Sequence, residues 1–133
     1  MNTSIAGLPA FIAYFFVSLG LTALYLVTYL TATAHREIAL VREGNLAASL
    51  ALGGSLLGYS IPLSAAVRYA GSLLDCIVWG LVALVVQVAI YWLMRPLLPN
   101  LSRRIDEGET APAVLLGAAS LAGGLVNAAC MSY

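Results

Sequence analysis

The chain has 133 residues, of which 62% are hydrophobic and only 9% are charged, and its mean hydropathy is +0.95. Soluble domains carry charge on about a quarter of their residues, because their surface faces water. The composition therefore excludes a water-soluble globular fold, a disordered chain and a nucleic-acid binder. Six arginines and six acidic residues cancel, so the net charge points to no charged partner, and the expected surroundings are a lipid bilayer.

Four apolar stretches are long enough to cross a membrane as helices, which takes about 20 residues at a rise of about 1.5 Å each. The first precedes Arg36, the first charged residue, and the other three are charge-free runs at 44–67, 76–94 and 110–133. We predict spans at about 5–29, 45–67, 75–97 and 111–132. The fold class is all-α, since a β-barrel would show short alternating segments. The first stretch has no preceding positive residue, so we expect an uncleaved helix rather than a signal peptide.

The arginines predict the orientation of the chain. Five of the six lie in or beside the segments 31–43 and 96–109, and only Arg68 lies in the remaining loop. Positive residues favour the cytoplasmic side, so we expect these two segments inside and both termini in the periplasm. Cys76 and Cys130 would then lie at the outer ends of spans three and four. Either a periplasmic disulfide or two free apolar thiols would fit this placement.

An internal repeat relates the two halves of the chain. A shift of 64 residues aligns Glu43-Gly44 with Glu107-Gly108, each just before a predicted span. This alignment predicts a tandem repeat of two helical hairpins with the same orientation, residues 1–67 and 68–133. An acidic residue near a helix N-terminus interacts favourably with the helix dipole, so capping is a sufficient explanation for the two Glu-Gly pairs.

The composition of the spans predicts which helices pack closely. Gly, Ala, Ser and Thr fill 13 of 24 positions in each of the runs 44–67 and 110–133, but only 3 of 19 in the run 76–94. Small residues let helix backbones approach, so we expect spans two and four to be in contact through Gly54, Gly58, Ala119 and Gly123. Spans one and three should face more lipid, with aromatic belts at their ends. Their aromatic residues are Phe11, Tyr14, Phe15, Phe16, Tyr25, Tyr29, Trp79, Tyr91 and Trp92.

Polar residues inside the spans are the candidate functional residues, because each needs a partner in hydrocarbon. They form a candidate polar seam, with several members spaced along helix faces, that contains Ser49, Gly53, Ser60, Ser64, Ser120, Gly124, Asn127 and Gln87. The seam would lie between spans two and four or around an oligomer axis. A purely structural interpretation is interhelical hydrogen bonding, worth about 0.6 kcal/mol per bond on average. Pro62 frees the carbonyl of Gly58, which nearby serines could bond instead.

No pattern of catalytic or cofactor-binding residues is present. No carboxylate pair, metal-ligand cluster, nucleophile motif or phosphate loop occurs, and His35 is expected to be an ordinary loop residue. We therefore expect a protein that is not an enzyme and binds no cofactor. The first functional hypothesis is a small homo-oligomeric channel or permeability element. The alternative is a membrane scaffold that docks cytoplasmic or membrane proteins through its inner loops, around 35–42 and 95–109.

Two segments resemble a known family. The stretch NLAASLALGGSLLGYSIPLS (residues 45–64) and the closing AGGLVNAACMSY (residues 122–133) are similar to the YjfL family of small bacterial inner-membrane proteins. The similarity covers essentially the whole chain and implies a multi-pass protein of the inner membrane. It implies no activity, substrate or catalytic residue. It draws attention to Gly58, Tyr59, Pro62, Asn127 and Cys130, which lie in the two segments.

Overall fold

The computed structural model describes residues 5–32, 37–97 and 101–131, and these ranges contain helices and no strand. The long helices are α2 (Leu8–Ala32), α4 (Leu46–Tyr69), α5 (Leu73–Leu97) and α7 (Thr110–Cys130). Two helices of six residues, α3 (Glu37–Arg42) and α6 (Leu101–Asp106), precede α4 and α7. The all-α fold class predicted from the sequence is confirmed.

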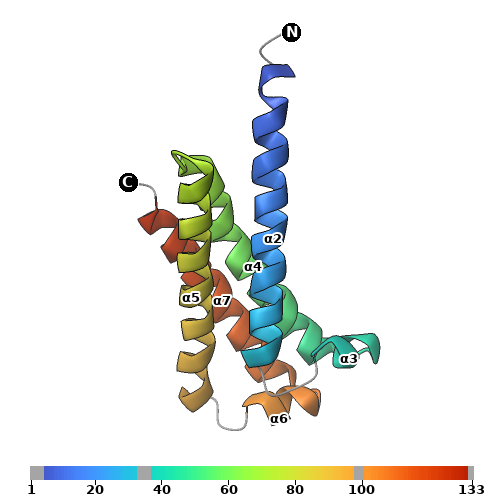
Figure 1. Cartoon of the computed structure of the whole chain (residues 1–133). Helices are drawn as coiled ribbons and strands as arrows, with labels where there is room; N and C mark the ends of the chain where they lie inside the picture. The colour runs from blue at the N-terminus through green and yellow to red at the C-terminus, as the bar shows by residue number, and fades with distance from the viewer. Residues whose placement is uncertain (1–4, 33–36, 98–100, 132–133) are drawn as a thin grey trace.

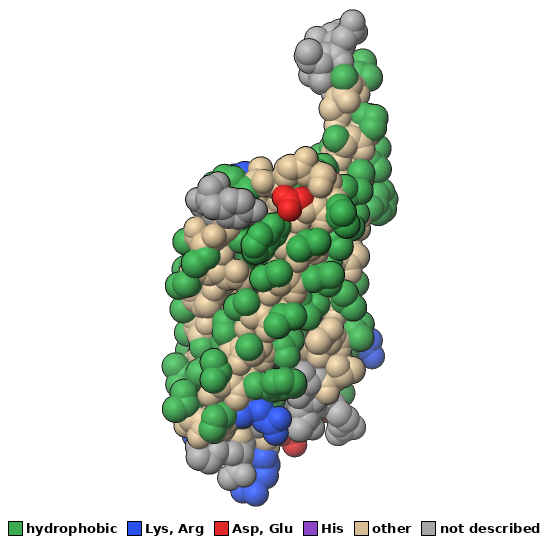
Figure 2. Space-filling view, turned by 60° about the vertical axis from the view of Figure 1, so that its left-hand side comes forward, with side chains coloured by type: hydrophobic (Ala, Val, Ile, Leu, Met, Phe, Trp, Pro, Cys, Tyr) green, Lys and Arg blue, Asp and Glu red, His purple; other side chains and the backbone are tan. Residues whose placement is uncertain are grey.

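All four long helices are long and apolar enough to cross a membrane. Their ends lie within three residues of the predicted spans, and the end of α5 at Leu97 coincides with the prediction. The differences arise because charge-free runs mark where a helix can be buried in lipid and not where it begins. Figure 2 shows hydrophobic side chains along the flank of the molecule and most of the visible arginine side chains towards its lower end. This distribution is the one expected of a multi-pass membrane protein.

Helices α4 and α7 form the most extensive contact and cross each other in the centre of the molecule (Figure 1). Their backbones touch where side chains are missing or small. A methyl group on Gly54 would lie 2.5 Å from the Cα of Gly117, and one on Gly58 would lie 2.5 Å from the carbonyl oxygen of Ser120. In lipid, this close packing is a main source of helix association, so the α4–α7 crossing is the core of the fold.

The short helices α3 and α6 end in the same way, and neither was predicted from the sequence. Gly44 (φ 84°) and Gly108 (φ 87°) adopt the left-handed conformation. At each one, two backbone hydrogen bonds close a Schellman motif: the N–H of Gly44 donates to the Val41 carbonyl and the next N–H to Leu40, and Gly108 repeats the pattern. Glycine is favoured because it adopts positive φ without strain.

The capping explanation of the two Glu-Gly pairs is therefore only partly right, because the glycine of each pair ends the preceding short helix by adopting a positive φ. Asn45 is the N-cap of α4, and its side chain accepts a hydrogen bond from the N–H of Ala48 at 3.0 Å. Glu109, the N-cap of α7, makes no side-chain capping bond. The shared sequence of short helix, left-handed glycine and spanning helix is compatible with a tandem repeat of hairpins.

Helix α2 is attached to the other helices mainly through its second half. Leu21, Tyr25 and Tyr29 are buried, and Leu21 packs against Gly80 of α5. The first half of α2 exposes its large apolar side chains and extends beyond the α4–α5 turn (Figure 1). At that turn Asp75 accepts a hydrogen bond from the N–H of Gly71 at 3.0 Å. Cys76 is buried, Cys130 is exposed, and both thiols are free.

Candidate functional site

The residues of the predicted seam lie on two different surfaces. Ser120 and Gly124 on α7 are buried against α4, where a methyl group on Gly124 would overlap the carbonyl oxygen of Gly58. Ser49 and Gly53 on α4 are partly exposed, and Ser60 and Ser64 farther along the same helix are exposed. The structure thus separates a closed polar centre between helices from an open polar face on α4.

Gln87 of α5 is the polar side chain of the closed centre that makes the most interhelical bonds. It is 1% exposed, and its Nε2 donates to the carbonyl oxygens of Gly58 at 2.9 Å and Ser120 at 3.2 Å. The Gly58 carbonyl is the one that Pro62 leaves without its helical N–H. Gln87, rather than a nearby serine, supplies the missing donor, and it connects three helices at one point.

Two further polar atoms of the centre are buried. The Oε1 of Gln87 and the Nδ2 of Asn127 have no hydrogen-bond partner within the described residues. Both belong to the predicted seam, and both lie inside the protein. In this centre the Nε2 of Gln87 holds α4, α5 and α7 together, whereas these two atoms make no hydrogen bond within the described residues.

Four tyrosines form a buried ladder beside this centre, from Tyr59 through Tyr25 and Tyr29 to Tyr91. The Tyr25 and Tyr59 rings stack with centroids 4.4 Å apart, and the later steps are 6.1 Å and 5.8 Å. The hydroxyl of Tyr59 donates to the Gly80 carbonyl at 2.9 Å, and the Tyr25 hydroxyl is bonded to Ser55. The ladder joins α2, α4 and α5.

The ladder corrects the expectation that the aromatic residues of spans one and three form lipid-facing belts. Tyr25, Tyr29 and Tyr91 are each no more than 2% exposed. Trp92, Phe11 and Phe16 are exposed as expected. Ser55, the partner of Tyr25, was not predicted as a site residue. Leu21, Tyr25 and Tyr29 are spaced four residues apart and so lie on one helix face. This spacing was the signal in the sequence that the two tyrosines could be buried together.

The predicted packing residues divide between two interfaces. Gly54 and Gly58 lie at the α4–α7 crossing. Gly123 instead faces α5, where a methyl group would overlap the side chain of Ile90, and Ala119 is partly exposed. The face of α7 that meets α4 carries Gly117, Ser120 and Gly124, rather than the Ala119–Gly123 pair.

The open face of α4 is bordered by shallow grooves. A groove between α4 and α7 is lined by Ser49, Gly53 and Leu57 on α4 and by Val114, Ala118 and Leu121 on α7. Nearer the α4–α5 turn, two more grooves meet at Ser64 and Arg68, one against α2 and one against α7. The hydroxyls of Ser49 and Ser60 donate to carbonyls of their own helix, at 2.8 Å and 2.9 Å, so each oxygen keeps its lone pairs for accepting a hydrogen bond.

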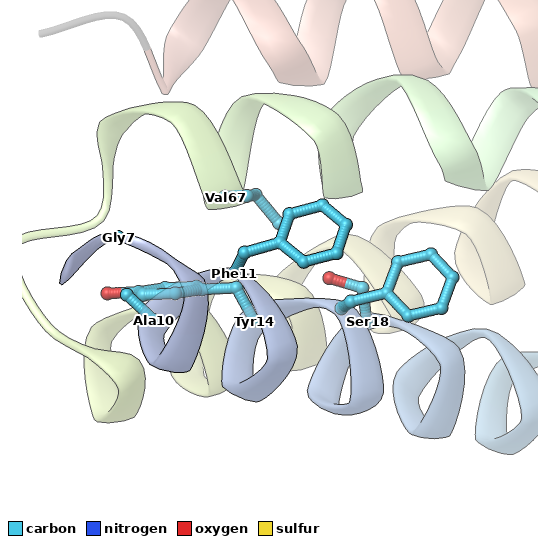
Figure 3. Close-up of a pocket in the computed structure, with 7 residues that line it drawn as sticks. Gly7, Ala10, Phe11, Tyr14, Ser18 and Val67 are labelled. Carbon is cyan, nitrogen blue, oxygen red and sulfur yellow. The ribbon is translucent and has the colours of Figure 1, made fainter. Parts of the chain in front are cut away.

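A fourth groove is lined mainly by apolar side chains. It lies between the first half of α2 and the end of α4, where Phe11 is beside Val67 (Figure 3). Phe11 and Phe15 stack with their centroids 5.7 Å apart. The groove shares Ser18 and Val67 with the α2 side of the open face, so the two surfaces are continuous.

The described residues contain no group of three or more His, Cys, Asp or Glu side chains that could hold a metal ion. His35 lies outside the residues that the structure describes. The polar groups of the closed centre and of the open face of α4 are hydroxyls, amides and the guanidinium of Arg68, which suit hydrogen bonding and phosphate or carboxylate binding.

Comparison with known proteins agrees with this architecture. The sequence pattern of the family described as Domain of Unknown Function (DUF350) matches residues 3–131. The chain is 44% identical to the UPF0719 inner membrane protein YjfL of Escherichia coli strain K12 over 126 residues, which are 95% of this chain and 96% of that protein. YjfL of E. coli O157:H7 matches equally.

A more distant relative is the UPF0719 transmembrane protein YshE of Bacillus subtilis strain 168. It is 30% identical over 95 residues, which cover 71% of this chain and 69% of that protein. No solved structure matches the chain. The resemblance to the YjfL family is confirmed, and the chain belongs to the DUF350 family of multi-pass membrane proteins, whose domain has no assigned function.

Proposed function

We propose that the protein is a permeability element of a bacterial inner membrane, in which the open face of α4 provides a path for polar groups. The observation that carries this proposal is the exposure of Ser60, Ser64 and Arg68 on a helix that crosses the membrane. With Ser49 and Gly53, these residues follow α4 for most of its length. Polar side chains that face outward in a membrane helix cost free energy, so they indicate a path or a partner.

The other long helices support this assignment by contrast. The exposed surfaces of α2 and α5 consist largely of Phe, Leu, Ile and Val, as expected of helices that contact acyl chains, whereas α4 exposes serines and Arg68 beside leucines. The closed centre is a less suitable path, because Gln87 and Ser120 are occupied with interhelical bonds. If several copies assemble, as the sequence predicts, their α4 faces would line a shared path.

A double substitution on the open face tests this function. We expect Ser60→Leu with Ser64→Leu to reduce ion or small-solute flux from proteoliposomes towards that of protein-free vesicles, because leucine makes the face as apolar as its neighbours. Both residues are exposed, so folding should be retained. Thr28→Val is the matched control, since Thr28 also donates to its own helix from an exposed position.

Flux should be measured over a range of voltage and pH, with the native mass determined in nanodiscs. Wild-type flux no greater than that of empty vesicles would reject the path. Flux that survives the double substitution but disappears with Thr28→Val would also reject it, because the path would then lie along α2.

A second candidate function is a scaffold, which is favoured by the polar ledge formed by α3 and α6. The ledge lies at the end of the molecule opposite the α4–α5 turn (Figure 1). The Nδ2 of Asn45 donates to the carbonyls of Ile105 and Asp106, each at 3.2 Å, and so joins the two short-helix segments. Ion pairs link Arg103 to Glu107 and Arg104 to Glu109. We propose that the ledge faces the cytoplasm.

If the ledge docks another protein, neutralising its exposed charges should abolish recovery of that partner. We expect Arg42→Gln with Arg103→Gln to remove a cross-linked partner from native membranes while the fold is retained, because both side chains are exposed. The leucine double variant of the open face is the control, since it leaves the ledge unchanged. Equal recovery by all the variants would count against docking through the ledge.

A further inference from the structure

The end of α4 near the α4–α5 turn has an unusual arrangement of one cation and two grooves. Arg68 and Ser64 line both grooves, one of which is completed by α2 through Ser18 and the other by α7 through Ala128 and Ala129. The grooves extend from Arg68 along α4 towards the middle of the helix, as far as Ser60 and Ile61. They therefore begin at one charged side chain and run side by side into the membrane.

Arg68 is available for an external anion. Its side chain is exposed, and none of the acidic side chains in the described part of the chain forms an ion pair with it. Asp75, on the same side of the molecule, accepts the Gly71 N–H instead. A guanidinium at the end of a spanning helix lies near the level of lipid headgroups, and its planar donors match a phosphate.

The two grooves offer apolar surface to acyl chains beside the hydroxyls of Ser18, Ser60 and Ser64. Ser64 separates them with a small side chain, Leu63 and Val67 contribute apolar surface on the α2 side, and Ala65 does so on the α7 side. A diacyl phospholipid matches this arrangement, because its phosphate would lie at Arg68 and one acyl chain would lie on each side of Ser64.

We propose that this end of α4 binds an anionic phospholipid, with its phosphate at Arg68 and its two acyl chains in the two grooves. The inference goes beyond the proposed function and stands apart from it: the lipid would occupy the Arg68 end of the open face of α4, and a path for polar groups would have to end beside it. A cation that forms no ion pair with an acidic side chain of the described residues favours a headgroup with net negative charge over a zwitterionic one.

The test is lipid retention, measured by native mass spectrometry of the protein released from nanodiscs that contain equal amounts of phosphatidylglycerol and phosphatidylethanolamine. We expect the wild type to retain phosphatidylglycerol preferentially and Arg68→Gln to retain about tenfold less, the scale of one lost charge-assisted hydrogen bond. Arg95→Gln is the matched control, because Arg95 is an exposed arginine in the last turn of α5. Equal retention by the wild type and Arg68→Gln overturns the proposal.

A second variant tests the grooves while Arg68 is kept. Ser64→Phe fills the floor between them and should also reduce retention, and unchanged retention would overturn the placement of the acyl chains. Inorganic phosphate in excess should not displace the lipid, since it makes no contact with the grooves; displacement would show a phosphate site and overturn the lipid assignment. Retention that depends on Arg68 without solute flux keeps the lipid site and rejects the path, whereas flux with retention independent of Arg68 rejects the lipid site alone.

Discussion

Replacing Gly124 by alanine is expected to destabilise the protein by about 1–3 kcal/mol, the usual cost of forcing extra volume into a packed core. The added methyl group would overlap the carbonyl oxygen of Gly58 and lie 3.0 Å from its carbonyl carbon. Backbone cannot move aside as a flexible side chain can, so α4 and α7 must separate. The measurement is unfolding in mixed micelles with increasing sodium dodecyl sulfate, followed by the fluorescence of Trp79 and Trp92.

Gly53→Ala is the matched control for this prediction. Gly53 lies in the same crossing region of α4, but a methyl group there has no neighbour within 4 Å. Alanine is a better helix former than glycine, so this variant should be neutral or slightly more stable than the wild type. Equal destabilisation by the two substitutions would contradict the close α4–α7 contact, because the loss would then not depend on overlap with the backbone of the neighbouring helix.

Replacing Gln87 by methionine is expected to cost about 1–3 kcal/mol of unfolding free energy, since buried acceptors lose their donor. Methionine keeps the length and most of the volume of the side chain, so the loss reports hydrogen bonding rather than a cavity. The carbonyls of Gly58 and Ser120 would both lose the Nε2 donor. The same unfolding measurement applies, and no loss of stability would mean that these bonds contribute nothing net in the membrane.

A double-mutant cycle with Pro62→Ala isolates the bond to Gly58. Alanine at position 62 restores an N–H that can donate to the Gly58 carbonyl four residues earlier. Gln87→Met should therefore cost less in the Pro62→Ala background than in the wild type, with the difference reporting the Gln87–Gly58 coupling. Additive effects would show that Gln87 does not compensate for the proline, and the bond to Ser120 would have to account for the loss.

The sequence predicts the fold class and the four spans well because lipid imposes them. A spanning helix must be apolar and about 20 residues long, so residues such as Glu43, Arg68, Asp75 and Glu109 mark its limits. Helices α3 and α6 were missed for a physical reason. Each has six residues and is ended by a left-handed glycine, so neither hydropathy nor a helical repeat of apolar residues is long enough to reveal it.

The candidate site was predicted in part, because composition identifies polar residues but not the face that each one occupies. Gln87 and Ser120 lie in the closed centre, whereas Ser60 and Ser64 lie on the open face of α4. Ser55 is a serine of α4 like Ser60 and Ser64, and only the helix face on which it lies places it against Tyr25. Which face of α4 meets α7 depends on backbone contacts between helices far apart in sequence, such as that of Gly54 with Gly117.

The pairing of α4 with α7 also fixes the order in which the protein can assemble during membrane insertion. Helix α4 leaves the translocon before α5, so the Gly58 carbonyl that Pro62 has released enters the bilayer before Gln87 is present to bond it. The glycine surface of α4 stays uncovered longer still, until α7 has been synthesised. Insertion and packing are then separate stages, as is general for helical membrane proteins. The nascent hairpin of α4 and α5 is accordingly the stage at which the glycine surface of this chain is still uncovered.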